Sequence, residues 1–147
     1  MYHLVYTSYG SQPFSESDLI QLLNQSNTWN KTKEITGMLL YLQGKFIQVL
    51  EGDKSEVKKL YEKIANDTRH KKVTIVIEGD YPERLFKDWS MGFKQITDDE
   101  FKTLSGFQDI DAFFEKQQSR EGKNLILIFL QLFYKKNNTD FPEPAPY

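Results

Sequence analysis

One stretch constrains the fold of this chain most strongly: residues 45–51 (KFIQVLE), which lie between two glycines. Aromatic and β-branched residues between glycines predict a β-strand. Alternation along a strand puts Phe46, Gln48 and Leu50 on one face. Gln48 therefore shares a face with two large apolar side chains. Its buried amide is either a core group satisfied by the backbone or a group facing a ligand that has its own hydrogen-bonding edge.

The flanking patterns place this strand in a mixed sheet. N-cap signatures at Ser15 and Asp53, each followed by apolar residues at helical spacing, predict helices over residues 15–28 and 53–66. Further strands are predicted over 2–8, 35–42, 73–77 and 89–95, with a hairpin turn at Gln43-Gly44 and a short helical turn at 82–86. The order β-α-β-β-α-β-β resembles an α+β, ferredoxin-like five-stranded sheet with two helices on one face. Its first and third strands are expected to be neighbours, which puts Tyr6 near Gln48 under the helices.

The pattern changes after Thr97. Residues 110–117 and 122–136 predict helices that could cover the other face of the sheet, although periodicity alone does not distinguish the apolar run at 125–130 from a buried strand. Residues 139–147 are proline-rich and are expected to be disordered. We therefore expect a domain over 1–97, a helical extension over 98–138 and a tail over 139–147.

Composition excludes several classes of function. The chain of 147 residues has a net charge of −2, so no basic excess points to nucleic acid. It contains no cysteine, which excludes disulfides and thiolate chemistry and favours the cytoplasm. The longest apolar run, residues 125–130, is too short to cross a membrane. No metal-ligand spacing links His3 and His70, which are expected to be surface or structural residues.

Five fragments, in order along residues 2–97, carry a resemblance to a known family. They are Leu-Val-Tyr-Thr-Ser at 4–8, Asn30 followed by Ile-Thr-Gly-Met-Leu-Leu-Tyr at 35–41, Phe-Ile-Gln-Val-Leu-Glu-Gly at 46–52, Asp-Thr-Arg-His at 67–70, and Trp-Ser-Met at 89–91. This part of the chain resembles the BLUF domain, a blue-light sensor that uses FAD. In that family the flavin ring lies between the two helices, against the sheet.

The resemblance implies roles for individual residues. Tyr6 matches the photoactive tyrosine, Gln48 the switching glutamine, and Asn30 the asparagine that hydrogen-bonds the polar edge of the ring. Trp89 and Met91 match the signalling residues of the last strand. The cofactor-binding set implied by position is Tyr6, Ser8, Trp29, Asn30, Ile35, Gln48, Lys63, Asp67, Arg69 and Met91.

Two positions depart from the family pattern. Arginine is common at the position of Lys63, and histidine or asparagine is often found at the position of Trp29. An indole beside the flavin could compete with tyrosine as an electron donor.

The function implied is light-driven transfer of an electron and a proton from Tyr6 to the flavin, which rearranges the hydrogen bonds of Gln48 and gives a red-shifted signalling state. Excited flavin is a strong oxidant, and a tyrosine is a suitable donor in a chain without cysteine. Rotation and tautomerisation of the amide both remain open. No cyclase or phosphodiesterase segment follows in the sequence. We therefore expect a photoreceptor, not an enzyme, that signals to a separate downstream protein or by self-association as a homo-oligomer.

Two other functions are compatible with the same fold. A flavin-free interaction module would share the sheet and helices but would be colourless. A small hydrolase of the acylphosphatase type needs an arginine in the loop after the first strand, and Tyr9-Gly10-Ser11-Gln12-Pro13 has none.

Overall fold

The computed structural model of the chain describes residues 1–12, 14–42, 44–87, 91–97, 99 and 102. The helices expected at 110–117 and 122–136, the tail and, apart from residues 99 and 102, the extension over 98–138 lie outside the described residues. In the described part, neither helix is long and apolar enough to cross a membrane.

The sheet has five strands in the order β4-β1-β3-β2-β5. Their bounds are β1 Tyr2–Gly10, β2 Thr36–Leu42, β3 Lys45–Gly52, β4 His70–Asp80 and β5 Gly92–Gln95. The central strand β3 is antiparallel to both β1 and β2, β4 is antiparallel to β1, and β5 is parallel to β2. This is the mixed, ferredoxin-like sheet that the sequence predicts, with β3 and β1 as neighbours.

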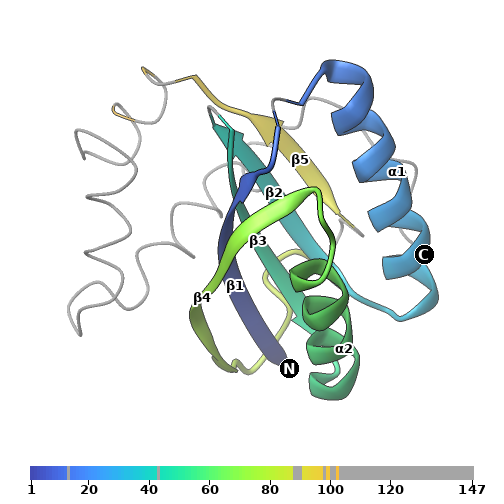
Figure 1. The fold of residues 1–147 in the computed structure, drawn as a ribbon. Helices are drawn as coiled ribbons and strands as arrows, with labels where there is room; N and C mark the ends of the chain where they lie inside the picture. Colours follow the sequence, from blue (N-terminus) through green and yellow to red (C-terminus); the bar gives the residue numbers. More distant parts are fainter. Residues whose placement is uncertain (13, 43, 88–90, 98, 100–101, 103–147) are drawn as a thin grey trace.

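Two helices pack on one face of the sheet, as Figure 1 shows. Helix α1 spans Glu16–Thr32 and helix α2 spans Lys54–Ala65. Ser15 and Asp18 form a capping box at the start of α1, and the Asp53 carboxylate caps α2 by accepting from two backbone N–H groups. The core between helices and sheet is a single apolar cluster that contains Leu4, Tyr6, Leu19, Leu22, Leu39, Phe46, Leu50, Val57, Leu60, Met91 and Phe93.

Helix α1 is one turn longer than the sequence indicated, since it runs to Thr32 instead of about Thr28. The inward face of the helix continues past Leu23 with Asn27 and Asn30, which are both buried. These inward positions keep the helical spacing, but they carry amides instead of apolar side chains. A prediction from apolar residues alone therefore ends the helix too early. Trp29 and Asn30 therefore belong to the last turns of a helix and not to a loop.

Two other expectations about local structure need correction. Strand β4 extends well beyond the predicted 73–77. Its pairing with β1 contains two register shifts, which break the simple alternation on which the prediction depended. Residues 82–86 form bends and not a helical turn. The N–H groups of Leu85 and Phe86 donate to the carboxylate of Glu51, at 2.8 and 2.6 Å, instead of to helical carbonyls.

Candidate functional site

Tyr6 and Gln48 are direct cross-strand partners in the β1–β3 pairing. Both are buried, and the Tyr6 hydroxyl donates a hydrogen bond to Oε1 of Gln48. Burial, followed by the nearby Tyr61 and Asp67, raises the pKa of Tyr6 above its ordinary value. The phenol is therefore neutral at physiological pH, and its proton points at an amide oxygen.

The other end of the Gln48 amide reaches toward β5. Its Nε2 donates to the sulfur of Met91 at 3.2 Å, and Met91 is fully buried just before that strand. A thioether is a weak acceptor, so this bond is easily exchanged for a better one. The amide is thus satisfied by two side chains, not by the backbone as in the core interpretation of Gln48.

A cavity of about 90 Å³ lies beside this pair. It lies between α1, α2 and the sheet, and the start of β4 with the residues before it closes one side. Its lining residues are Tyr6, Leu22, Gln25, Ser26, Trp29, Asn30, Leu39, Gln48, Leu60, Lys63, Ile64, Asp67, Arg69 and His70. Apolar side chains from both helices thus face amides from α1 and β3, which suits a flat apolar ligand with one polar edge.

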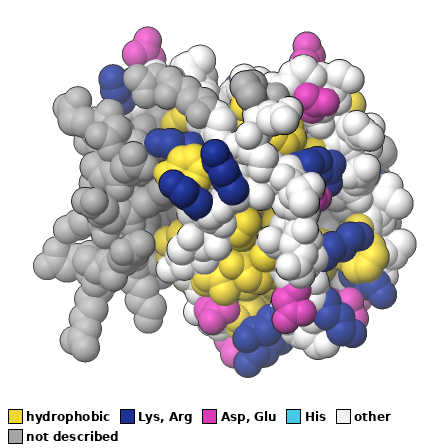
Figure 2. All heavy atoms as spheres, viewed as in Figure 1, with side chains coloured by type: hydrophobic (Ala, Val, Ile, Leu, Met, Phe, Trp, Pro, Cys, Tyr) yellow, Lys and Arg dark blue, Asp and Glu magenta, His cyan; other side chains and the backbone are white. Residues whose placement is uncertain are grey.

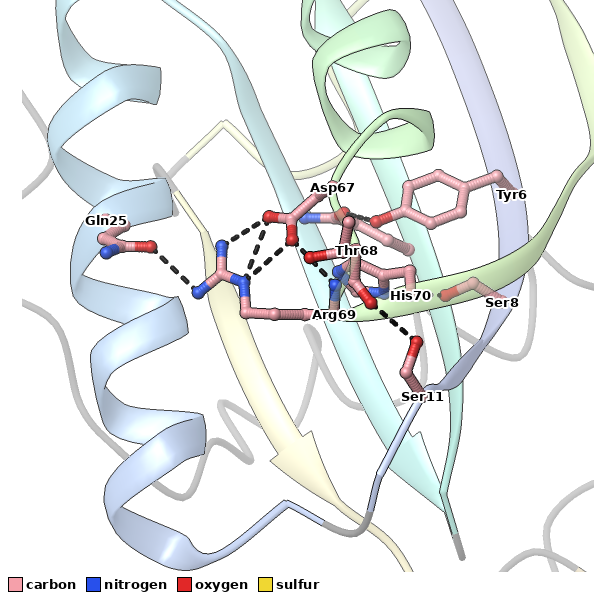
Figure 3. Close-up of polar contacts among 9 residues, drawn as sticks. Tyr6, Ser8, Ser11, Gln25, Asp67, Thr68, Arg69 and His70 are labelled. Carbon is pink, nitrogen blue, oxygen red and sulfur yellow. Dashed lines mark hydrogen bonds and ion pairs between the residues drawn. The ribbon is translucent and has the colours of Figure 1, made fainter.

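An ion pair closes one side of the cavity (Figure 3). Nη2 of Arg69 lies 2.6 Å from a carboxylate oxygen of Asp67, and Nε donates to both carboxylate oxygens at 3.1 Å. These hydrogen bonds hold the pKa of Asp67 below its ordinary value. Nη1 of the same arginine donates to Gln25 Oε1 at 3.1 Å, so the pair also ties α1 to the start of β4.

Ser8 and His70 form a second polar contact near the cavity. Ser8 Oγ lies 3.1 Å from Nδ1 of His70, and both residues are buried. Burial lowers the pKa of His70, which favours the neutral imidazole. The imidazole ring of His70 also packs edge-on against the ring of Phe46, with 5.1 Å between the ring centres.

Trp29 on α1 and Lys63 on α2 both line the cavity, and their side chains are in contact. The ammonium nitrogen of Lys63 is 4.0 Å from the centre of the indole ring. The two residues also line an open groove of about 700 Å³ along α1, so they stand between the cavity and that groove. The indole Nε1 is buried and has no hydrogen-bond partner among the described residues.

Most of the residues that the sequence singled out meet at this cavity. Tyr6, Trp29, Asn30, Gln48, Lys63, Asp67 and Arg69 line it, and Ser8 and Met91 contact lining residues. Ile35 lies in the apolar core, where its N–H donates to the carbonyl of Asn30 at 2.9 Å. Trp89 lies outside the described residues.

Sequence reasoning missed several residues of the cavity. His70 was expected at the surface or in a structural role, but it lies buried in the cavity wall. The signal was present in the fragment Asp-Thr-Arg-His, whose first and third residues were selected. Leu22, Gln25, Leu60 and Ile64 were read only as helical residues, because their direction toward the site depends on how α1 and α2 pack.

The chain is similar to proteins of known family and structure. The profile of the family described as "BLUF: Sensors of blue-light using FAD" matches residues 1–92. The chain is 36% identical over 107 residues to the photoactivated adenylate cyclase subunit alpha of Euglena gracilis, and 34% identical over 108 residues to subunit beta. These matches take in 73% of this chain but only 10% and 12% of those relatives. The chain therefore spans about a tenth of the length of the curated relatives it matches.

Solved structures share the fold of this chain. BlsA in its photo-activated state superposes with a TM-score of 0.79 at 25% identity, over 95% of this chain and 99% of that one. A bacterial light-regulated adenylyl cyclase gives a TM-score of 0.65 at 30% identity, over 88% of this chain and 39% of the cyclase.

Proposed function

Because the chain belongs to the BLUF family, the sensors of blue light using FAD, we propose that it is a photoreceptor in which Tyr6 and Gln48 form the light-driven switch. One observation carries the proposal. The buried phenol of Tyr6 donates to one end of the Gln48 amide, and the other end donates to Met91. We take residues 1–97 as the sensor domain.

The residues of the cavity fit a flavin. A buried indole N–H at Trp29 has no partner in the part of the chain that the structure describes and could donate to a ring carbonyl. The amides of Asn30 and Gln48 lie on the same cavity, which supplies donors and acceptors for a polar edge. The cavity alone is smaller than the roughly 300 Å³ typical of ligand pockets, but it adjoins the open groove through Gln25, Trp29 and Lys63. We propose that Lys63, Asp67 and Arg69 hold the cofactor at this junction and that the cofactor is FAD.

When bound, a flavin absorbs blue light and becomes a strong one-electron oxidant. Tyr6 then gives up an electron and, because an oxidised phenol is a strong acid, its proton as well. The Gln48 oxygen already accepts that proton in a hydrogen bond, so the side chains provide the start of a proton path. When the electron and proton return to Tyr6, no bond has been made or broken overall.

Gln48 is the group that changes. If its amide rotates or changes tautomer, the donor and acceptor ends exchange places, and the Nε2–Met91 bond is replaced. That bond is weak, so little free energy opposes the exchange. We propose that the new hydrogen bond from the amide to the ring causes the red shift.

The signal is proposed to leave through the last strand. Met91 contacts the amide directly, and it immediately precedes β5 at the edge of the sheet. Loss of its hydrogen bond would change the packing of that edge, and Trp89 is proposed to move with it. The relatives include light-regulated adenylyl cyclases, and for this chain we expect a downstream signalling protein or a second copy of the chain as receiver.

The proposal is tested with the full chain purified in the presence of FAD. It should be yellow, and blue light should shift its absorption to the red, with reversal in the dark. Gln48→Leu should keep the colour and lose the shift. Gln21→Leu, at an exposed position of α1, serves as the control and should behave like wild type. A chain that stays colourless would instead support the flavin-free module, and a normal shift in Gln48→Leu would reject the switch.

A further inference from the structure

Lysines flank several aromatic rings in the described part of the chain. Figure 2 shows basic side chains around separate apolar patches on the visible face. Trp29 has the closest such contact, with Nζ of Lys63 at 4.0 Å from the ring centre and Nζ of Lys33 at 5.6 Å. Two lysines also lie near Tyr2 and near Tyr9, all at more than 5.5 Å. The indole is the ring among these that lines the candidate flavin cavity.

We propose that Lys63 prevents Trp29 from reducing the photo-excited flavin and so leaves Tyr6 as the productive electron donor. The proposal rests on the proposed function, since it concerns the choice of donor in the same site. Lys63 is thus a residue that determines the specificity of the photoreaction and does not itself react.

The physical basis is the charge of the oxidised indole. If Trp29 gives one electron to the excited flavin, the indole becomes a radical cation and the flavin gains one electron. The attraction between an ammonium group and the electron-rich ring is then lost and replaced by repulsion between two positive charges. Oxidation of Trp29 is therefore disfavoured relative to an indole without neighbouring cations.

The hydrogen-bond acceptors of Trp29 and Tyr6 also favour Tyr6 as the electron donor. Nε1 of Trp29 is buried and finds no hydrogen-bond acceptor, so no protein base in the described part of the chain is placed to take its proton. Tyr6, in contrast, already donates to an amide oxygen. The phenol can lose its positive charge by passing its proton along this bond, whereas the described residues offer the indole beside Lys63 no such acceptor.

Nearby carboxylates do not cancel the effect, because each has another cation. Asp67 is paired with Arg69 at 2.6 Å. Glu56 lies 4.0 Å from Lys33 and 3.9 Å from Lys59. Lys63 is exposed and has no acidic partner within ion-pair distance among the described residues. Its charge is thus directed at the indole.

The first test uses the flavin-loaded chain and transient absorption after a blue pulse. Lys63→Gln should raise the yield of the tryptophan radical by about threefold or more, the factor expected for loss of an exposed cation–π contact alone, and should lower the yield of the red-shifted state. Lys63→Arg keeps the charge, so its yield of the tryptophan radical should lie well below that of Lys63→Gln. Lys59→Gln removes another exposed lysine of the same helix and should have no effect. Adding Trp29→Phe to Lys63→Gln should restore the red-shifted yield.

The second test needs no flavin and so separates this proposal from the proposed function. In a Trp89→Phe background, Trp29 is the remaining tryptophan of the chain. Azide radicals generated by pulse radiolysis should oxidise Trp29 more readily in Lys63→Gln than in Lys63→Arg. Equal oxidation in the two variants would overturn the role of Lys63, even if the photoreceptor works. A difference here would support it, even if the flavin-loaded chain showed no red shift.

Discussion

Two buried tyrosines of β1 show how the partner of a phenol decides its chemistry. Tyr2 donates to the carboxylate of Glu78 at 2.6 Å, whereas Tyr6 donates to the neutral amide of Gln48. The closeness of Tyr6 and Gln48 could be predicted from strand order and alternation. The Met91 contact could not, because a thioether leaves no polar signal in a sequence.

Replacing Tyr6 with phenylalanine tests the donor. Tyr6→Phe removes the electron and proton source but keeps the ring, so the light-induced red shift should disappear while FAD stays bound. The measurement is the light-minus-dark absorption spectrum. Tyr61→Phe is the matched control, because that ring lies 5.8 Å from the Tyr6 ring and lacks the bond to Gln48. Normal photoconversion of Tyr6→Phe would reject Tyr6 as donor.

The helices position the cavity, and their ends decide which residues reach it. The start of each helix could be predicted from Ser15 and Asp53, since capping side chains are local signals. The end of α1 could not, because buried amides continue its inward face. The contact between Trp29 and Lys63 could not be predicted either, because it requires both residues to be helical and the two helices to pack together.

Helix α2 should depend on its cap. The Asp53 carboxylate accepts from the N–H groups of Ser55 and Glu56 at 3.1 and 3.3 Å. Asp53→Ala should therefore lower the free energy of unfolding by about 1 kcal/mol, measured by urea denaturation. Ser55→Ala, at an exposed position in the first turn of the same helix, should change it by less than about 0.5 kcal/mol. Equal effects of the two substitutions would argue against the cap.

At the scale of the whole molecule, Glu51 connects the sheet to the segment that precedes β5. This fully buried carboxylate lies 2.7 Å from Nε2 of His3 on β1 and accepts from Thr36 on β2 at 2.7 Å. It also accepts from the N–H groups of Leu85 and Phe86. The sequence could not predict the partners of Glu51, because they come from three separate parts of the chain.

Glu51→Gln should lower the free energy of unfolding by about 3 kcal/mol, since it breaks a buried, fully hydrogen-bonded charge. Burial alone would raise the pKa of Glu51, but the hydrogen bonds from His3, Leu85, Thr36 and Phe86 outweigh it and hold the pKa below the ordinary 4.5. The folded state thus favours the carboxylate, and stability that is present above pH 4.5 should be lost as pH falls through the lower, folded-state value.

Urea denaturation between pH 3 and 7 measures both effects. The variant should lose less stability on acidification than wild type, because it lacks the titrating group. Glu56→Gln, on the surface of α2, is the control and should show the wild-type dependence on pH within about 0.5 kcal/mol. An acid response in Glu51→Gln as steep as that of wild type would assign the loss to other carboxylates.

The pairing of Tyr6 with Gln48 across β1 and β3 has a practical consequence for engineering. Their spacing is held by the ladder of main-chain bonds on either side, so neither partner relies on its immediate neighbours in sequence to find the other. A slip of one residue between the strands would turn one of them to the opposite surface and separate them completely. Transplanting the pair into another sheet of this topology would therefore demand the same alignment of strands more than the same surrounding amino acids.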